Sequence, residues 1–194
     1  DMQHVFITRK KLDNPSAVEL ADADRWEQFY QAIDSVVVPN NKRLLDYFRA
    51  HGLEIIFAKI ECRKKNGADR SLDHKATGYN ELLLVPNDPL GDIVPELAPV
   101  DDEIVITKTT DSALTGSTLR LTLHNMGIDT VVVTGVLTDQ CVSGTVRSLA
   151  DESFKVWLIE DACRASTAQI QANELEMLNN IYCHVITTDE LLEA

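Results

Sequence analysis

The stretch Thr130-Val-Val-Val-Thr-Gly-Val136, followed by Leu137-Thr-Asp-Gln-Cys-Val142, decides the fold. Its first seven residues are almost all apolar, which is typical of a strand covered on both faces. The residues that follow predict a helix directly after Cys141, since Val146 and Leu149 lie on one face at helical spacing. A buried strand that leads straight into a helix is typical of a parallel sheet in an α/β protein.

Four other short apolar runs predict strands, and amphipathic segments between them predict helices. The predicted strands are Glu54–Ile60, Ile104–Thr107, Lys155–Glu160 and His184–Thr187. The predicted helices are Val38–Ala50, Ser117–Met126 and the segment after Cys141, whereas the long segment Cys62–Pro99 has no clear pattern. Because strands and helices alternate through the second half, we expect a three-layer α/β/α sandwich with a central, mostly parallel sheet of about six strands.

Length and composition restrict the class of protein further. A chain of 194 residues suits a single domain over 1–194. The formal charge of −13 disfavours nucleic acid as a partner, and no apolar run reaches the length of a membrane span. The four cysteines form no C-x-x-C pair, which excludes the common zinc motifs. Free thiols indicate a reducing compartment, so we expect a cytoplasmic protein.

Cys141 is the candidate for chemistry. It lies where a buried strand meets a helix, and ligands of open α/β sheets bind at the carboxyl ends of the strands. The helix N–H groups and the helix dipole favour a thiolate and lower the pKa of a thiol, and they can also stabilise an oxyanion. The alternative is a buried structural cysteine. Cys62, Cys163 and Cys183 have no comparable context and are interpreted as packing residues.

Several motifs together resemble one family. The segment Gly135-Val-Leu-Thr-Asp-Gln-Cys-Val142 is similar to the nucleophile motif of the isochorismatase-like cysteine hydrolases. Ile106-Thr-Lys-Thr-Thr-Asp-Ser112, with Gly116-Ser-Thr-Leu119 after it, resembles the lysine motif of that family. Asp1-Met-Gln3 resembles the end of its first strand, and Asp161-Ala162 resembles an acidic turn after a later strand. The motifs occur in the expected order over nearly the whole chain, which is more specific than any one of them.

This resemblance implies a catalytic triad of Asp1, Lys108 and Cys141. Lys108 would lower the pKa of the thiol, and Asp1 would carry the proton from the thiol to the leaving amine and later activate water. Cys141 would attack the carbonyl carbon and form a thioester. The resemblance also implies a cis peptide bond between Val136 and Leu137, and an oxyanion hole made by the backbone N–H groups of Leu137 and Cys141.

The chain departs from the family pattern in two places. In relatives an apolar strand precedes the aspartate, so we expect that residues upstream of Asp1 belong to the natural protein. The metal-binding relatives carry an Asp-x-His pair after the second strand, whereas that loop has only His74 here, so we expect no metal and no cofactor. The true isochorismatases, which cleave a vinyl ether, generally lack the cysteine, and its presence favours amide chemistry.

Substrate contacts are predicted from a basic loop and from two further residues. The loop carries Arg63, Lys64, Lys65, Arg70, His74 and Lys75. Arg70 is the best candidate to bind substrate oxygens because its guanidinium is a planar donor fork, and a solvated loop is the alternative. Asp69-Arg70-Ser71 and His74-Lys75 are similar to family members that act on biuret, triuret or ureidoacrylate. Gln140 and Tyr79 are also expected to face the pocket.

The expected function is therefore metal-independent hydrolysis of a small carbamoyl or ureido amide, with release of ammonia. One alternative is another small-amide hydrolase of the family, of the nicotinamide or maleamate type. The other is a non-catalytic member of the fold that binds a ligand or serves as a scaffold. The resemblance also implies a homodimer or homotetramer, with a small-molecule amide as the ligand and with neither nucleic acid nor a membrane as a partner.

Overall fold

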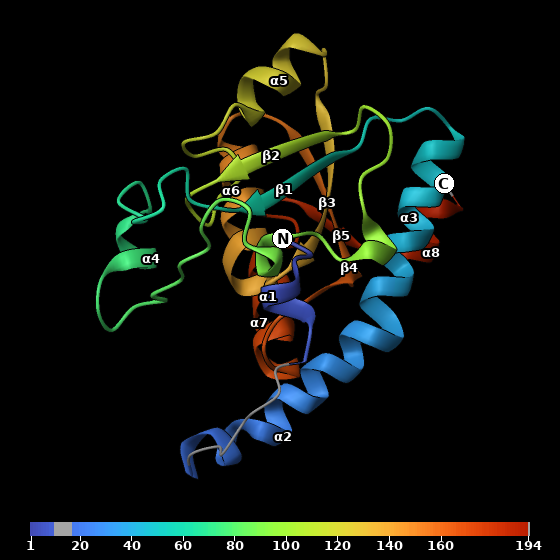
Figure 1. Ribbon diagram of the computed structural model, residues 1–194. Coiled ribbons are helices and arrows are strands. Elements are labelled where there is room, and N and C mark those ends of the chain that lie inside the picture. Colours follow the sequence, from blue (N-terminus) through green and yellow to red (C-terminus); the bar gives the residue numbers. More distant parts are fainter. Residues whose placement is uncertain (10–16, 194) are drawn as a thin grey trace.

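In the computed structural model, which describes residues 1–9 and 17–193, the apolar segment before Leu137 is strand β3 (Thr130–Val136) (Figure 1). It pairs in parallel with β4 (Lys155–Arg164), which pairs in parallel with β5 (His184–Ile186). The register of β3 and β4 starts at Thr130 opposite Lys155 and shifts between Val133 and Gly135.

Helices cover both faces of this three-stranded sheet, because neighbouring residues of each strand point to opposite sides. One face packs against α5 (Leu119–Asn125), α6 (Ser143–Asp151) and α7 (Ala168–Leu178), with Val133, Leu158, Val146, Leu149 and Leu178 in one apolar cluster. The other face packs against α3 (Val38–Ala50) and α8 (Thr188–Leu192), with Val132, Ile159, Ile186, Leu44 and Leu191 in another. The layers on this sheet are thus helix, sheet and helix.

The remaining two strands form a separate parallel sheet. Strands β1 (Ile56–Ile60) and β2 (Ile104–Lys108) pair from Ile56 opposite Ile104 to Ile60 opposite Lys108. This sheet is separated from β3 by a cavity of about 150 Å³, which residues of β1 and of β3 line. The predicted α/β class and the five predicted strands are therefore present. The described residues form one sheet of two strands and one of three, however, and not the predicted single sheet of about six.

One long helical stretch was only partly predicted. α2 (Ala17–Ala32) continues through a π-helical turn, η1 (Ile33–Val37), into α3. Phe29, Ile33 and Val37 lie four residues apart and are buried in one cluster. Their spacing puts them on one helix face, which packs on the N-terminal segment and on the segment before β2. None of the helices in the described ranges is long and apolar enough to cross a membrane.

The segment between β1 and β2 contains only short helices, namely α4 (Leu72–Lys75), η2 (Pro89–Gly91) and η3 (Pro95–Leu97). The chain start, with α1 (His4–Ile7), is fixed to this region by the buried Gln3 side chain. Gln3 Nε2 donates to the carbonyl oxygens of Ile60 and Gly91 at 2.9 and 2.8 Å, and Ile60 N donates to Gln3 Oε1 at 2.8 Å. Asp1 is thereby held beside the carboxyl end of β1.

The acidic segment Asp161-Ala162 lies inside β4, and the prediction that it forms a turn after the strand is wrong. β4 continues four residues beyond the predicted end at Glu160, as far as Arg164. Asp161 Oδ1 accepts hydrogen bonds from the backbone N and the hydroxyl of Thr188, both at 2.8 Å. Asp161 therefore fixes the start of α8 and does not mark a loop.

Candidate active site

Three residues from separate segments, Asp1, Lys108 and Cys141, line one cavity of about 230 Å³. Lys108 ends β2 and is 1% exposed, and its Nζ lies 2.9 Å from Asp1 Oδ2. Lys108 Nζ also donates to the carbonyl oxygen of Thr110 at 3.1 Å. A buried ammonium group requires such partners, because an unpaired charge in the interior is strongly destabilising. The structure thus brings together the three side chains that the resemblance implied as a triad.

The turn before Cys141 has an unusual backbone. The peptide bond between Val136 and Leu137 is cis, at the position where the resemblance implied one. A π-helical turn, η4 (Thr138–Val142), follows and carries Cys141 to the start of α6. Gln140 N and Val142 N both donate to the carbonyl oxygen of Leu137, at 3.0 and 3.2 Å. Leu137 and Cys141 line a common cavity of about 110 Å³, and their role as an oxyanion hole stays a prediction.

The electrostatics of the thiol differ from the expectation. Burial raises the pKa of the Cys141 thiol, and Lys108 opposes this effect without reversing it. The helix dipole and the cation predicted a lowered thiol pKa, but desolvation dominates here. The negative charge of Asp111 raises the thiol pKa further. For Lys108, burial has the opposite sign and lowers the pKa of the ammonium group. The neighbouring Cys141 and Asp111 oppose this effect.

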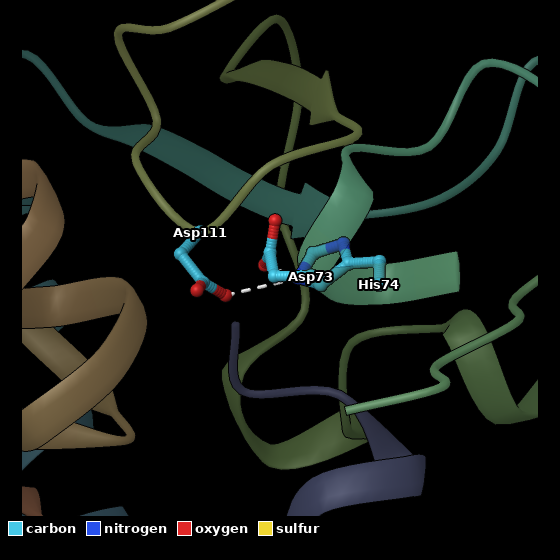
Figure 2. A group of neighbouring side chains, drawn as sticks. All are labelled: Asp73, His74 and Asp111. Carbon is cyan, nitrogen blue, oxygen red and sulfur yellow. Dashed lines mark hydrogen bonds and ion pairs between the residues drawn. The ribbon is translucent and has the colours of Figure 1, made fainter. Parts of the chain in front are cut away.

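Asp111 is a site residue that the sequence did not predict, and His74, predicted only as one member of the basic loop, lies beside it. Asp111 Oδ1 lies 3.6 Å from Cys141 Sγ. It also lies 3.0 Å from Nε2 of His74, a side chain that is 1% exposed, and Figure 2 shows this second contact. The hydrogen bond from His74 is the main reason that the pKa of the Asp111 carboxyl is lowered. Asp111 follows β2 by three residues, and the rule that ligands bind at the carboxyl ends of strands was the signal for it.

Figure 2 also shows Asp73 beside this pair. The ligand atoms of Asp73, His74 and Asp111 lie within 4.8 Å of one another, and such a donor set can hold a divalent cation. His74 Nε2 is engaged by Asp111 at 3.0 Å and lies 3.4 Å from Asp73 Oδ2, so a cation would have to displace the His74–Asp111 hydrogen bond. The expected absence of a metal stays a prediction.

Of the three predicted substrate contacts, only Gln140 lines the smaller cavity, together with Cys141. Arg70 and Tyr79 are not among its lining residues within the described chain. The Arg70 guanidinium donates to the carbonyl oxygens of Gly67, His74 and Leu82 at 3.1, 2.7 and 2.6 Å, and it therefore holds the loop together. The Tyr79 side chain points to solvent, with 65% of the residue exposed.

Comparison with known proteins places this site in a family. The isochorismatase domain model matches residues 1–190. The chain is 31% identical over 160 residues to the isochorismatase family protein YwoC of Bacillus subtilis, covering 81% of this chain and 82% of that one. It is 24% identical over 195 residues to the N-carbamoylsarcosine amidase of an Arthrobacter species, covering 93% and 71%.

A solved structure of similar fold is the cysteine hydrolase from Pseudomonas syringae pv. phaseolicola, with a TM-score of 0.78, 23% identity and coverage of 100% of this chain and 88% of that one. At that identity the likeness concerns the fold alone. The family model, by contrast, spans nearly every residue, including the cavity that holds Asp1, Lys108 and Cys141. The chain therefore belongs to the isochorismatase family of hydrolases.

Proposed function

We propose that the protein hydrolyses a carbon–nitrogen amide bond of a small carbamoyl or ureido compound, with Cys141 as the nucleophile. The observation that carries this proposal is the convergence of Asp1, Lys108 and Cys141, from three distant segments, on one cavity. The Cys–Lys–Asp combination supplies a nucleophile, a cation and a proton carrier, which are the groups that covalent amide hydrolysis needs. The similarity to an N-carbamoylsarcosine amidase supports amide chemistry.

Asp1 is suited to take the proton of the thiol. Its Oδ2 pairs with Lys108, whereas its buried Oδ1 has no hydrogen-bond partner among the residues that the structure describes. In the first step, the sulfur of Cys141 bonds to the carbonyl carbon while the thiol proton passes to Asp1. The raised thiol pKa makes this transfer necessary, because little thiolate exists before the substrate binds.

The remaining steps return the site to its starting state. The oxyanion forms against the N–H groups of Leu137 and Cys141. Asp1 gives its proton to the leaving nitrogen, the carbon–nitrogen bond breaks, and ammonia or an amine departs. Asp1 then takes a proton from water, and the resulting hydroxide attacks the thioester carbonyl. The carbon–sulfur bond breaks, Asp1 returns the proton to the sulfur, and the acid product leaves. The net reaction consumes one amide and one water.

Ammonia release from a panel of ureas and primary amides tests this proposal. We expect the wild type to release ammonia from at least one small ureido or carbamoyl compound and Cys141→Ala to lose this activity by about 10⁴-fold or more, as other nucleophile deletions do. An arm treated with EDTA should match the untreated wild type, since the mechanism uses no metal. Activity that survives in Cys141→Ala would overturn the assignment of the nucleophile, and loss with EDTA would overturn metal independence.

A non-catalytic ligand-binding member is the second candidate, and the burial of Cys141 favours it. The residue is 7% exposed, and its thiol pKa is raised, as for a structural cysteine. The two candidates differ in whether the rate at which iodoacetamide alkylates Cys141 depends on Asp1. In an enzyme with Asp1 as the base, Asp1→Asn should slow the alkylation, because the buried thiol loses its proton acceptor. A packing thiol should react at the same rate in both proteins, and the amide panel should then be inactive.

A further inference from the structure

A carboxylate faces the nucleophile from a side that the proposed reaction does not use. Asp111 lines the 110 Å³ cavity with Cys141, and its Oδ1 accepts a hydrogen bond from the Cys141 thiol, with 3.6 Å between the sulfur and the oxygen. About a third of the Asp111 side chain is exposed, so it can be reached from the cavity. The triad carboxylate of Asp1, in contrast, is 3% exposed and is already paired with Lys108.

The geometry keeps Asp111 negatively charged. His74 Nε2 lies 3.0 Å from its Oδ1, and a carboxylate in such a pair accepts the hydrogen bond. The other ring nitrogen of His74, Nδ1, is buried without a hydrogen-bond partner among the described residues. A proton on Nδ1 would therefore be buried without an acceptor, which favours a neutral ring that donates through Nε2. The His74–Asp111 pair thus carries one net negative charge.

Lys108 interacts electrostatically with Asp111 and helps to lower the pKa of its carboxyl, but no lysine or arginine of the described chain lies at the cavity wall. The polar lining consists of His74, Asn80, Asp111, Gln140 and Cys141, with neither lysine nor arginine. Lys108, close to the sulfur, is paired with Asp1 at 2.9 Å. Arg70 is occupied by three loop carbonyl oxygens. A substrate carboxylate in this cavity would be repelled by Asp111 and would have no cationic side chain at the wall to pair with. An N–H donor of the substrate, in contrast, would find hydrogen-bond acceptors there.

We propose that Asp111 is a specificity-determining residue that accepts a hydrogen bond from an N–H or ammonium group of the substrate and excludes anionic amides. The inference rests on the proposed function and narrows it to a substrate class: small neutral or cationic ureas and amides. The side-chain amides of Asn80 and Gln140 suit the same class, since each offers both a donor and an acceptor.

Paired alkylating reagents test the charge selection at the sulfur without turnover. Iodoacetamide is neutral and iodoacetate is anionic, and mass spectrometry of the Cys141 peptide reads the label at this cysteine alone. Relative to the rate ratio for free cysteine, we expect wild-type Cys141 to favour iodoacetamide by about tenfold or more, as repulsion between close carboxylates predicts. A change in thiol pKa cancels in this ratio, because it affects both reagents equally.

Three variants assign the effect. Asp111→Asn should bring the ratio to that of free cysteine, and Asp111→Glu, which keeps the charge, should retain at least part of the preference. Asp73→Asn is the matched control: it removes a charge 3.4 Å from the same His74 nitrogen, but Asp73 does not line the cavity. We expect its ratio to stay within about twofold of the wild type. A preference that survives in Asp111→Asn, or one that the wild type lacks, would overturn the proposal.

Matched amides separate this inference from the function on which it rests. Succinamide is neutral with two equivalent primary amides, and succinamate is anionic with one, so rates are compared per amide group. We expect kcat/KM to favour the neutral compound in the wild type and the preference to fall by about tenfold in Asp111→Asn. Hydrolysis with equal preference in the two proteins would refute the role of Asp111 and leave the amidase proposal intact. Absence of hydrolysis over the whole amide panel would count against the amidase itself, and the alkylation ratio would still decide the role of Asp111.

Discussion

At the scale of single residues, the site depends on one buried cation. Lys108 is 1% exposed and is paired with Asp1, and it is also the main group that opposes the burial-induced rise of the Cys141 thiol pKa. In the proposed first step, Asp1 loses its negative charge as it takes the thiol proton, and Lys108 remains beside the sulfur that attacks the carbonyl carbon. We therefore expect the same side chain to stabilise both the folded protein and that step.

Lys108→Met should raise the thiol pKa further, because it removes the positive charge and leaves the desolvation. The pH profile of Cys141 alkylation should then move to higher pH, with about a tenfold lower rate at fixed pH for each unit of pKa change. The unfolding free energy should also fall by about 3–5 kcal/mol, since the Asp1 carboxylate is left buried and unpaired.

The control for this prediction is Lys59→Met. Lys59 lies on the neighbouring strand β1 and pairs with Glu61 at 2.9 Å, but it does not line a cavity with Cys141. Its substitution should leave the alkylation profile in place. An alkylation profile of Lys108→Met that matches the wild type would rule out the electrostatic role of the lysine.

At the scale of elements, the loop that holds His74 is fixed by Arg70. Its guanidinium spans the loop from Gly67 to Leu82 and contacts the carbonyl oxygen of His74 between them. The Asp69 carboxylate fixes the start of the loop by accepting hydrogen bonds from the backbone N–H groups of Arg63 and Lys64. Arg70 thus acts on the site through the position of His74.

Arg70→Met should loosen this loop. Loss of charge-assisted hydrogen bonds of this kind costs about 2 kcal/mol, so amide hydrogen exchange over residues 66–83 should rise by about tenfold or more. Arg63→Met is the control, because the exposed Arg63 side chain makes a single long contact to Gly116. If Arg70 instead binds substrate, as the sequence suggests, KM should rise with unchanged exchange, and that result would refute the structural role.

The elements also show what a sequence can predict. Strand β3 has its predicted range because a nearly continuous apolar run marks both of its ends. Helix α3 has its predicted range because its apolar residues repeat regularly on one face. Helix α2 was missed, although Phe29, Ile33 and Val37 repeat at helical spacing. Strand β4 continues past Glu160 through Asp161 to Arg164, so the apolar pattern predicted an end that is too early. The predicted triad followed from motifs, whereas the His74–Asp111 pair joins α4 to a loop 37 residues further along the chain, and no local pattern encodes that contact.

At the scale of the whole molecule, a net charge of −13 also repels anions. This field acts over distance and is screened by salt, whereas the charge of Asp111 acts at contact with the sulfur. Both could contribute to the expected preference for neutral reagents. The expected homodimer or homotetramer stays a prediction, which sedimentation of the purified protein measures.

Salt separates the two sources of repulsion. In 1 M NaCl the screening length is about 3 Å, so the contribution of the distant charges should vanish. We expect the preference of Cys141 for iodoacetamide over iodoacetate to weaken but to remain severalfold larger in the wild type than in Asp111→Asn. A ratio that falls to the value of free cysteine in 1 M NaCl would assign the selection to the overall charge instead of to Asp111.

The central claim is that Cys141 forms a covalent bond to the substrate. Rapid acid quenching of the reaction with the amide that is hydrolysed fastest, followed by mass spectrometry of the Cys141 peptide, tests it directly. We expect this peptide to gain the mass of the acyl group within the first turnover and to lose it when the substrate is exhausted. Steady release of ammonia while the Cys141 peptide stays unmodified throughout, together with activity in Cys141→Ala, would contradict it.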